Sequence, residues 1–381
     1  MRSSTGGVGA WIRYGNPLEP GELDFAIAHY RAAILQPWET EAAARLKEAR
    51  PDMTVLAYRC LSSTRDFEPD SMRASGLSYR EARRRGWLAR RDNGDLVEWN
   101  TYPGHFQARV WDPDYRARWV EEVCQATAET AFDGVMADND VFDDYYGLDL
   151  PLDGIADTAA LRAELNIFVD QAGAGLNGVG KILIPNVAEA RREPGRWERH
   201  SAWGGGFDEC WLGWGDHHLF DEATALAQIH ELRGPGLSIV RTPDGGGGGS
   251  MSGARTSPGL YGLAAFWVFG GGEGAYTATG HDDYSRTAWF PALDADLGRP
   301  LGRPRRTSGA WVREFEGGVA AVALGEEGGG TVRLPAGLRS PGPTGDPDGE
   351  ALALEVPLSA HCGMIALRAW VMTRSGSCEI R

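Results

Sequence analysis

The feature of this 381-residue chain that most constrains its fold is a repeated alternation of short apolar runs with amphipathic helical stretches, from residue 7 to about 290. Strand–helix units of this kind build a parallel sheet, and eight of them close into a barrel. The sequence therefore predicts an α/β fold, a (β/α)8 TIM barrel. The expected strands cover residues 8–14, 53–60, 106–111, 132–138, 181–187, 207–214, 237–242 and 273–279, and residues 23–36 are expected to form a helix.

After about residue 305 the pattern changes to alternating apolar and polar residues, with Gly/Pro-rich turns between the runs. This period is typical of antiparallel strands. We therefore expect a barrel with the catalytic function at residues 1–305, a small C-terminal antiparallel β-sandwich domain at 306–370 and a loose tail at 371–381. Residues 61–104 are too long for a plain strand–helix loop, and the DNGD at 92–95 predicts a hairpin turn on the barrel mouth.

Composition excludes several classes of partner. The formal net charge of −15 repels phosphate backbones and anionic lipid, so we expect no nucleic acid and no membrane partner. The five cysteines show no CxxC spacing, and the glycine runs at 6–9 and 245–249 lack the context of a phosphate-binding loop, so we expect no metal and no cofactor. The chain as written has no signal peptide, which predicts a cytoplasmic protein; secretion stays open as an alternative if the gene start is truncated.

The most informative segment is FDGVMADND at residues 132–140, an apolar run that leads directly into acids. In a parallel barrel the body of a strand is buried, while its carboxyl end opens into the loops that form the active site. Gly134, Met136 and Asp138 share one face of the strand, so Asp138 is expected to point into the mouth. A helix cap or an Asx turn is the alternative interpretation of this acid.

A second acid is expected at the end of the sixth strand, in FDECWLGWGD at 207–216, which supplies Glu209 and Asp216. Glycoside hydrolysis uses such a pair of carboxylates. Aligning the two segments by their shared Phe-Asp places Gly213 opposite Asp138, and Glu209 then lies four residues below the mouth. Two alternatives therefore stay open for the second acid: a bulge in the strand lifts Glu209 to the mouth, or Asp216 takes its place. Asp112 is a further candidate, with helix capping as its alternative role.

The chain contains 14 tryptophans, and several aromatic residues fall near predicted strand ends, where flat apolar faces suit sugar rings. Ordinary core packing is the expected role for about half of them. Polar residues at strand ends are expected to bind hydroxyl groups. The predicted substrate-binding residues are Trp11, Tyr14, Tyr58, Arg59, Trp111, Asp112, Asp140, Asn186, Trp211, Trp214, Arg241, Tyr276 and His281.

With FDGVMADND preceded by VWDPDYRARWVEEV and followed by FDECWLGW, the chain resembles glycoside-hydrolase-like TIM-barrel families, related to the endo-α-1,4-polygalactosaminidases. The C-terminal VREFEGGVAAVALG also resembles the small β-sandwich appended to such barrels. The resemblance implies a catalytic Asp at Asp138 and a second acid at the end of strand six, where this chain has Gly213 by the alignment above.

These observations predict a glycoside hydrolase that cleaves an oligo- or polysaccharide without a metal, with Asp138 as nucleophile or base and Glu209 or Asp216 as acid. The alternative is a non-catalytic carbohydrate-binding barrel that keeps the aromatic residues but lacks a paired acid. A metal-dependent hydrolase is a third, more distant hypothesis. The sequence does not determine the sugar, the linkage, the stereochemical outcome or the oligomeric state.

Overall fold

The computed structural model describes residues 7–14, 17–139, 142–244, 258–280, 284, 289–325, 329–372 and 378–380. The chain divides into two compact units. The central unit consists of Ala33–Asp208 and Arg233–Leu237, and the terminal unit consists of Met1–Ala32, Glu209–Leu232 and Ser238–Arg381.

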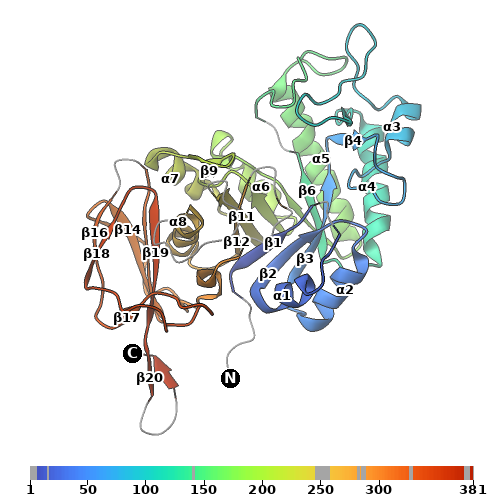
Figure 1. Ribbon diagram of the computed structural model, residues 1–381. Coiled ribbons are helices and arrows are strands. Elements are labelled where there is room, and N and C mark those ends of the chain that lie inside the picture. Colours follow the sequence, from blue (N-terminus) through green and yellow to red (C-terminus); the bar gives the residue numbers. More distant parts are fainter. Residues whose placement is uncertain are drawn as a thin grey trace. The chain divides into compact units, whose positions relative to one another are not determined.

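Eight strands form one parallel sheet in the order β7-β6-β3-β2-β1-β12-β11-β8 (Figure 1). Parallel bridges Leu183↔Gly204 and Asn186↔Phe207 join β7 to β8, so the sheet closes as a barrel. The predicted α/β barrel is confirmed. Its strands are β1 (Gly9–Ile12), β2 (Tyr30–Leu35), β3 (Thr54–Cys60), β6 (Gly134–Asp138), β7 (Ile182–Pro185), β8 (Gly205–Asp208), β11 (Leu237–Pro243) and β12 (Ala275–Thr279).

One predicted helix and one predicted barrel strand are wrong. Residues 23–36 are not one helix, because α1 (Glu22–His29) passes directly into β2 at Tyr30. Residues 106–111 do not form a barrel strand: β5 (His105–Gln107) pairs antiparallel with β4 (Ser63–Arg65) in a small sheet of its own. One unpredicted barrel strand, β2, replaces the predicted strand at 106–111, so the count of barrel strands is unchanged. β6 therefore remains the fourth barrel strand and β8 the sixth.

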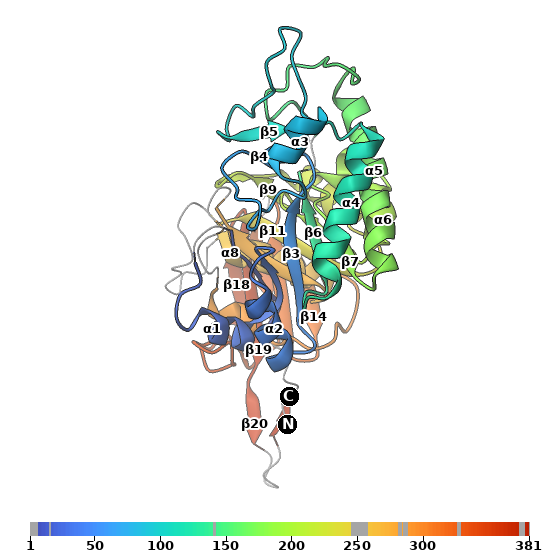
Figure 2. The same cartoon turned by 90° about the vertical axis from the view of Figure 1, so that its right-hand side faces the viewer.

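The segment between β3 and α4 in the central unit contains β4, α3, β5 and a hairpin, and both views place it beyond the carboxyl ends of β3 and β6 (Figures 1 and 2). The expected turn is present, since Gly94 N donates to Arg91 O and the bridge Arg90↔Leu96 follows it. Long insertions at this end of a barrel are where binding loops occur.

Helices with clear start signals cover the central unit. Asp112 caps α4 (Pro113–Ala128) by accepting a hydrogen bond from Asp114 N, and Pro113 occupies the first turn. Asp157 caps α5 (Thr158–Gly178) in the same way, and α4 and α5 pack side by side (Figures 1 and 2). The remaining helices of this unit are α2 (Thr40–Ala49), α3 (Tyr79–Arg85), η1 (Ala190–Arg192) and α6 (Arg196–Ser201).

In the terminal unit a small hairpin, β9 (Gly213–Trp214) and β10 (His218–Leu219), follows the end of β8. Asp221 caps the helix that comes next by accepting from Thr224 N. The helices of this unit that have not yet been named are α7 (Glu222–Glu231), α8 (Pro258–Ala265), η2 (Phe266–Gly270) and η3 (Pro291–Asp294).

The C-terminal part forms the expected antiparallel β structure. A five-stranded sheet in the order β13-β14-β15-β19-β17 faces the pair β16-β18. Alternate residues of β15 bury both of its faces, because Val319 and Ala321 pack towards β16 and β18 whereas Ala320 and Val322 pack with α8. The strands are β13 (Arg305–Thr307), β14 (Ala310–Phe315), β15 (Gly318–Ala323), β16 (Gly330–Arg333), β17 (Leu338–Arg339), β18 (Glu355–Leu358) and β19 (Cys362–Arg368).

Near the C-terminus, where the sequence shows no pattern, β20 (Trp370–Met372) and β21 (Cys378–Ile380) pair antiparallel. The division of the chain into parts at residues 305 and 370 stays a prediction. Within the described ranges, no helix is long and apolar enough to cross a membrane.

Candidate active site

β6 carries the acid predicted from FDGVMADND, and contacts in the central unit explain several positions of that segment. Asp133, just before the strand, accepts a hydrogen bond from Val55 N at 2.8 Å. Gly134 lies so close to the neighbouring strand that an added Cβ would be 2.0 Å from the carbonyl oxygen of Ile182. The middle of β6 is buried, whereas Asp138, its last residue, is partly exposed. The segment therefore anchors its strand at one end and presents a carboxylate at the other.

Both carboxylate oxygens of Asp138 accept hydrogen bonds from side chains on neighbouring strands. The hydroxyl of Tyr58, on β3, donates to Oδ2 at 2.7 Å, and Nδ2 of Asn186, just after β7, donates to Oδ1 at 3.1 Å. Tyr58 and Asn186 are both buried. Asp138 therefore has a fixed orientation, and the structure brings these three predicted residues together.

Arg65, which the sequence analysis did not select, lies directly behind Tyr58. Its Nη2 donates to the Tyr58 hydroxyl at 3.2 Å, and its Nη1 pairs with Oε1 of Glu68 at 2.9 Å. Burial alone lowers the pKa of Arg65, but the neighbouring Tyr58 and Glu68 more than offset this and raise it above the ordinary value. Glu68 is fixed in turn by Ala74 N and Ser75 N, at 2.8 and 3.2 Å. The guanidinium is thus a permanent cation one hydrogen bond from Tyr58.

The residue after the acid, Asn139, has a left-handed backbone (φ 82°) and is held by three contacts. Its Oδ1 accepts from the thiol of Cys60, its carbonyl oxygen accepts from Ser62 Oγ at 3.2 Å, and its Nδ2 donates to the hydroxyl of Tyr146 at 3.0 Å. Tyr146 stacks on Trp99 of the inserted hairpin, with ring centroids 3.7 Å apart. Burial raises the pKa of the Cys60 thiol, so this group is a hydrogen-bond donor here and not a nucleophile.

The sixth strand ends earlier than expected, and this changes the position of Glu209. β8 stops at Asp208, and Gly213–Trp214 belongs to the separate hairpin β9-β10, so the placement of Glu209 four residues below the mouth is wrong. Phe207 is bridged to Asn186, whose amide binds Asp138, and the next residue, Asp208, is fully buried. Glu209 follows Asp208 in the chain. Its pairing with Asp138 stays a prediction, because the two residues belong to different units.

Arg241 in the terminal unit is not available to a substrate, because neighbouring residues occupy its donors. It is fully buried, and its guanidinium donates to the carbonyl oxygens of Glu209 at 3.3 Å and Gly215 at 2.9 Å and to Thr279 Oγ1 at 3.1 Å. These contacts fix the segment that starts at Glu209 to the ends of β11 and β12. Asp216, the alternative acid, is exposed in the turn of the β9-β10 hairpin.

Two predicted polar residues have structural contacts. Arg59 lies on the face of β3 opposite to Tyr58, and its Nη1 donates to Arg73 O at 2.8 Å. Burial, with the nearby charge of Arg73, lowers the pKa of Arg59 to about 10. Asp112 is the N-cap of α4, which is the alternative role that the sequence analysis gave it. The structure does not bring Arg59 to Asp138.

The predicted aromatic residues divide into packed and exposed sets. Trp11 stacks on Tyr30, and Tyr276 is fully buried with its hydroxyl bonded to Gly259 O and Thr242. Trp211 is likewise buried in the core of the terminal unit.

The other set is more open. Trp214 is 55% exposed on the β9-β10 hairpin. Tyr14 contacts the ring of Tyr284, and the indole of Trp111 donates to Asp153 O at 3.1 Å. Asp140 and His281 lie outside the described residues.

No group of three or more His, Cys, Asp or Glu side chains arranged to hold a metal occurs in the described part of the chain. In the central unit, Asp138 lies with the Tyr58 hydroxyl, the Asn186 amide and the Arg65 guanidinium, whose side chain is 16% exposed.

Comparison with known proteins identifies the chain as a glycosyl hydrolase. The model of hypothetical glycosyl hydrolase family 15 matches residues 47–319, well over half of the chain, and the chain belongs to this family. No curated protein sequence matches.

Several solved structures are similar to this chain. A noncanonic maltogenic α-amylase, AmyB, from Thermotoga neapolitana is 11% identical (TM-score 0.51), with 96% of this chain and 99% of that chain covered. An α-amylase from Lactobacillus plantarum is also 11% identical (TM-score 0.52; 94% and 97% covered). Aspergillus fumigatus Ega3, in complex with galactosamine, is 14% identical (TM-score 0.46; 76% and 96% covered). The similarity to the two amylases shows the barrel fold of this glycosyl hydrolase.

Proposed function

We propose that this glycosyl hydrolase cleaves an O-glycosidic bond of an oligo- or polysaccharide, with Asp138 as the carboxylate that attacks the anomeric carbon or activates water. The observation that supports this most is the fixed orientation of Asp138 at the carboxyl end of the fourth barrel strand, with one donor on each oxygen. Active sites of TIM-barrel enzymes are built at this end of the strands.

Glu209 is the proposed proton donor, and Asp216 is the alternative. Glu209 follows the last residue of β8, and Arg241 holds its backbone. As the glycosidic C–O bond breaks, the acid gives its proton to the leaving oxygen. Asp138 then either forms a bond to the anomeric carbon, which water later hydrolyses, or takes a proton from the attacking water. Paired-carboxylate chemistry needs no metal, and we propose that activity is insensitive to chelators.

Release of reducing ends from a panel of oligo- and polysaccharides tests the proposal. Asp138→Asn should lower kcat by at least about 1,000-fold, because the amide neither attacks nor accepts a proton. Asp114→Asn makes the same chemical change in the exposed first turn of α4 and should leave kcat unchanged. Equal activity of wild type and Asp138→Asn would remove Asp138 from the mechanism.

Comparison of two further variants separates the candidate acids. Glu209→Gln should lose activity on poor leaving groups and keep it on activated aryl glycosides, which need no proton, whereas Asp216→Asn should behave like wild type. The reverse result would make Asp216 the acid. If the wild-type protein binds a glycan in calorimetry but releases no reducing ends from any glycan of the panel, the chain is a carbohydrate-binding barrel instead.

A further inference from the structure

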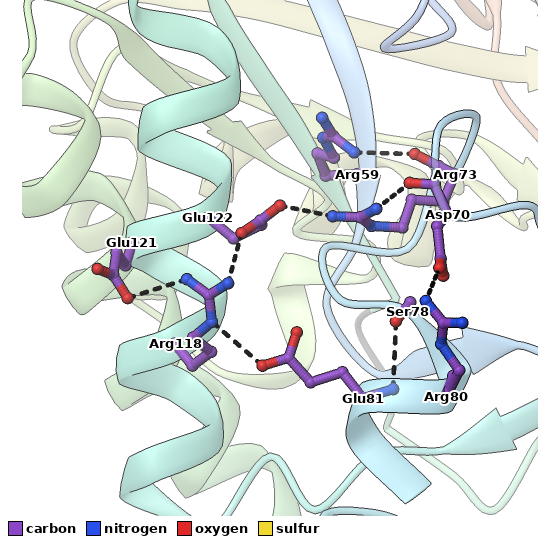
Figure 3. A network of polar contacts seen from close by, with 9 residues as sticks. All are labelled: Arg59, Asp70, Arg73, Ser78, Arg80, Glu81, Arg118, Glu121 and Glu122. Atoms are coloured by element: carbon purple, nitrogen blue, oxygen red, sulfur yellow. Dashed lines mark hydrogen bonds and ion pairs between the residues drawn. The ribbon is translucent and has the colours of Figure 1, made fainter. Parts of the chain in front are cut away.

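The segment between β4 and α3 in the central unit is held by a network of ion pairs that joins it to α4 and α3 (Figure 3). Arg73 pairs with Glu122 at 2.6 Å, and Arg118 pairs with Glu122 at 2.8 Å and with Glu81 at 3.3 Å. The carbonyl oxygen of Arg73 also accepts from Arg59. These contacts fix the backbone on either side of residue 73 against α4 and β3.

The backbone fixed in this way holds Glu68. Ala74 N and Ser75 N, directly after Arg73, bind its two carboxylate oxygens. Glu68 is nearly buried, its side chain only 8% exposed, and its Oε1 also pairs with Arg65. A continuous series of contacts therefore runs from α4 through the segment to Glu68 and Arg65.

Arg65 determines the direction of the next hydrogen bond. A guanidinium can only donate, so the Tyr58 oxygen must accept from Arg65. The single hydroxyl proton of Tyr58 is then directed to Oδ2 of Asp138, 2.7 Å away. With Asn186 donating to Oδ1, each oxygen of Asp138 faces a donor hydrogen.

We propose that Arg65 is a positioning residue of the hydrolysis: through Tyr58 it fixes Asp138 as the carboxylate that attacks or activates water, and not as the acid. This rests on the proposed function of Asp138. Hydrogen bonds donated to both of its oxygens stabilise the ionised carboxylate over the neutral acid. Arg65 acts only through Tyr58 and does not reach the reacting atoms. The role of proton donor therefore falls to a different residue.

A double-mutant cycle tests the coupling. Arg65→Met keeps an unbranched apolar stem but removes every donor, and Tyr58→Phe removes the hydroxyl. Each should lower kcat by roughly 10- to 100-fold with little change in KM, the effect expected for loss of one charge-assisted hydrogen bond. In the double variant the loss should be close to that of Tyr58→Phe alone, since Arg65 acts through the hydroxyl. If the double variant instead loses kcat by the product of the two single losses, the proposal is overturned.

Two further variants separate positioning from stability. Arg65→Lys keeps the charge and one donor and should retain more activity than Arg65→Met. Arg84→Gln removes a cation from the exposed face of α3 and should leave kcat unchanged. If Lys and Met at position 65 lower kcat equally while both proteins unfold at the wild-type midpoint, charge and donor geometry are irrelevant and the proposal is wrong.

A measurement that needs no substrate distinguishes this proposal from the proposed function. In protein labelled with 13Cζ-tyrosine, the Tyr58 signal is identified by its loss in Tyr58→Phe. Its chemical shift should change in Arg65→Met and in Asp138→Asn and should stay the same in Arg84→Gln. A Tyr58 signal unaffected by Arg65→Met overturns the inference even if glycans are hydrolysed. A shifted signal in a protein without hydrolase activity supports the contact and overturns the proposed function, and with it the catalytic role of Arg65.

Discussion

The close approach of β6 and β7 makes a sharp prediction for Gly134→Ala. A Cβ at Gly134 would lie 2.0 Å from the carbonyl oxygen and 2.7 Å from the carbonyl carbon of Ile182, its register partner on β7. Non-bonded heavy atoms need about 3.5 Å, so the two strands must separate by more than about 1 Å. The nearest atom, at 2.0 Å, belongs to the backbone, so rotation of the Ile182 side chain cannot relieve the contact.

The expected loss follows from two terms. Overpacking in a tight core destabilises by about 1–3 kcal/mol, and weakening the hydrogen bond from Ile182 N to Asp133 O, 3.1 Å long, adds about 1 kcal/mol. We therefore expect Gly134→Ala to lower the free energy of unfolding by about 2–4 kcal/mol, a large share of the total stability of a domain. Since β7 leads into Asn186, the contact with Asp138 should also weaken and kcat should fall.

Urea unfolding followed by circular dichroism measures the effect. Gly178→Ala is the matched control, because Gly178 lies in the last turn of α5 and an added Cβ there would meet nothing within 4 Å. Alanine at that position should leave the midpoint unchanged or raise it slightly. Equal midpoints for Gly134→Ala and wild type would refute the steric argument.

Two other predictions concern single buried groups. Asn139→Ala and Asn139→Gly lose the same side-chain contacts, but only glycine adopts the left-handed backbone without strain. In urea unfolding the alanine variant should therefore be less stable than the glycine variant by about 1 kcal/mol. Equal stabilities of the two variants would show that the backbone at φ 82° is not strained. Burial, together with Arg196, lowers the pKa of His200 from 6.5 to about 4. The unfolded chain therefore binds this proton more readily, so the stability that neutral His200 contributes is complete above about pH 6.5 and is lost as the pH falls towards 4. His200→Gln should flatten this pH dependence, and an unchanged slope would contradict the assignment.

Much of the architecture can be predicted from the chain because it depends on local periodicity. The fourth strand, its terminal acid and the C-terminal β structure all follow from patterns within about ten residues. The two errors arise where local patterns are ambiguous. Residues 30–35 are almost entirely buried, and a fully buried short strand has no periodicity that separates it from a helix. Residues 105–107 have strand character but pair within an insertion.

The candidate site was predicted in part. Tyr58, Asn186 and Asp138 were selected from strand ends, and the structure joins them by hydrogen bonds. Arg65 was missed because it lies in a long insertion without a repeating pattern, where no local signal shows which arginine turns inward. Arg59 was selected although strand alternation alone, with Tyr58 pointing inward, would have placed it on the opposite face.

Local patterns were sufficient to locate most of the barrel strands and to place Asp138 at the end of one of them, because burial pattern and strand ends are properties of neighbouring residues. Which side chains meet that carboxylate depends on the tertiary fold. Tyr58, Arg65 and Asn186 come from separate segments, and hydrogen bonds between them depend on strand register and loop anchoring, which long-range packing sets. The end of β8 was decided in the same way, since the pairing of Gly213–Trp214 in its own hairpin, and not any local signal, leaves Glu209 directly after the strand.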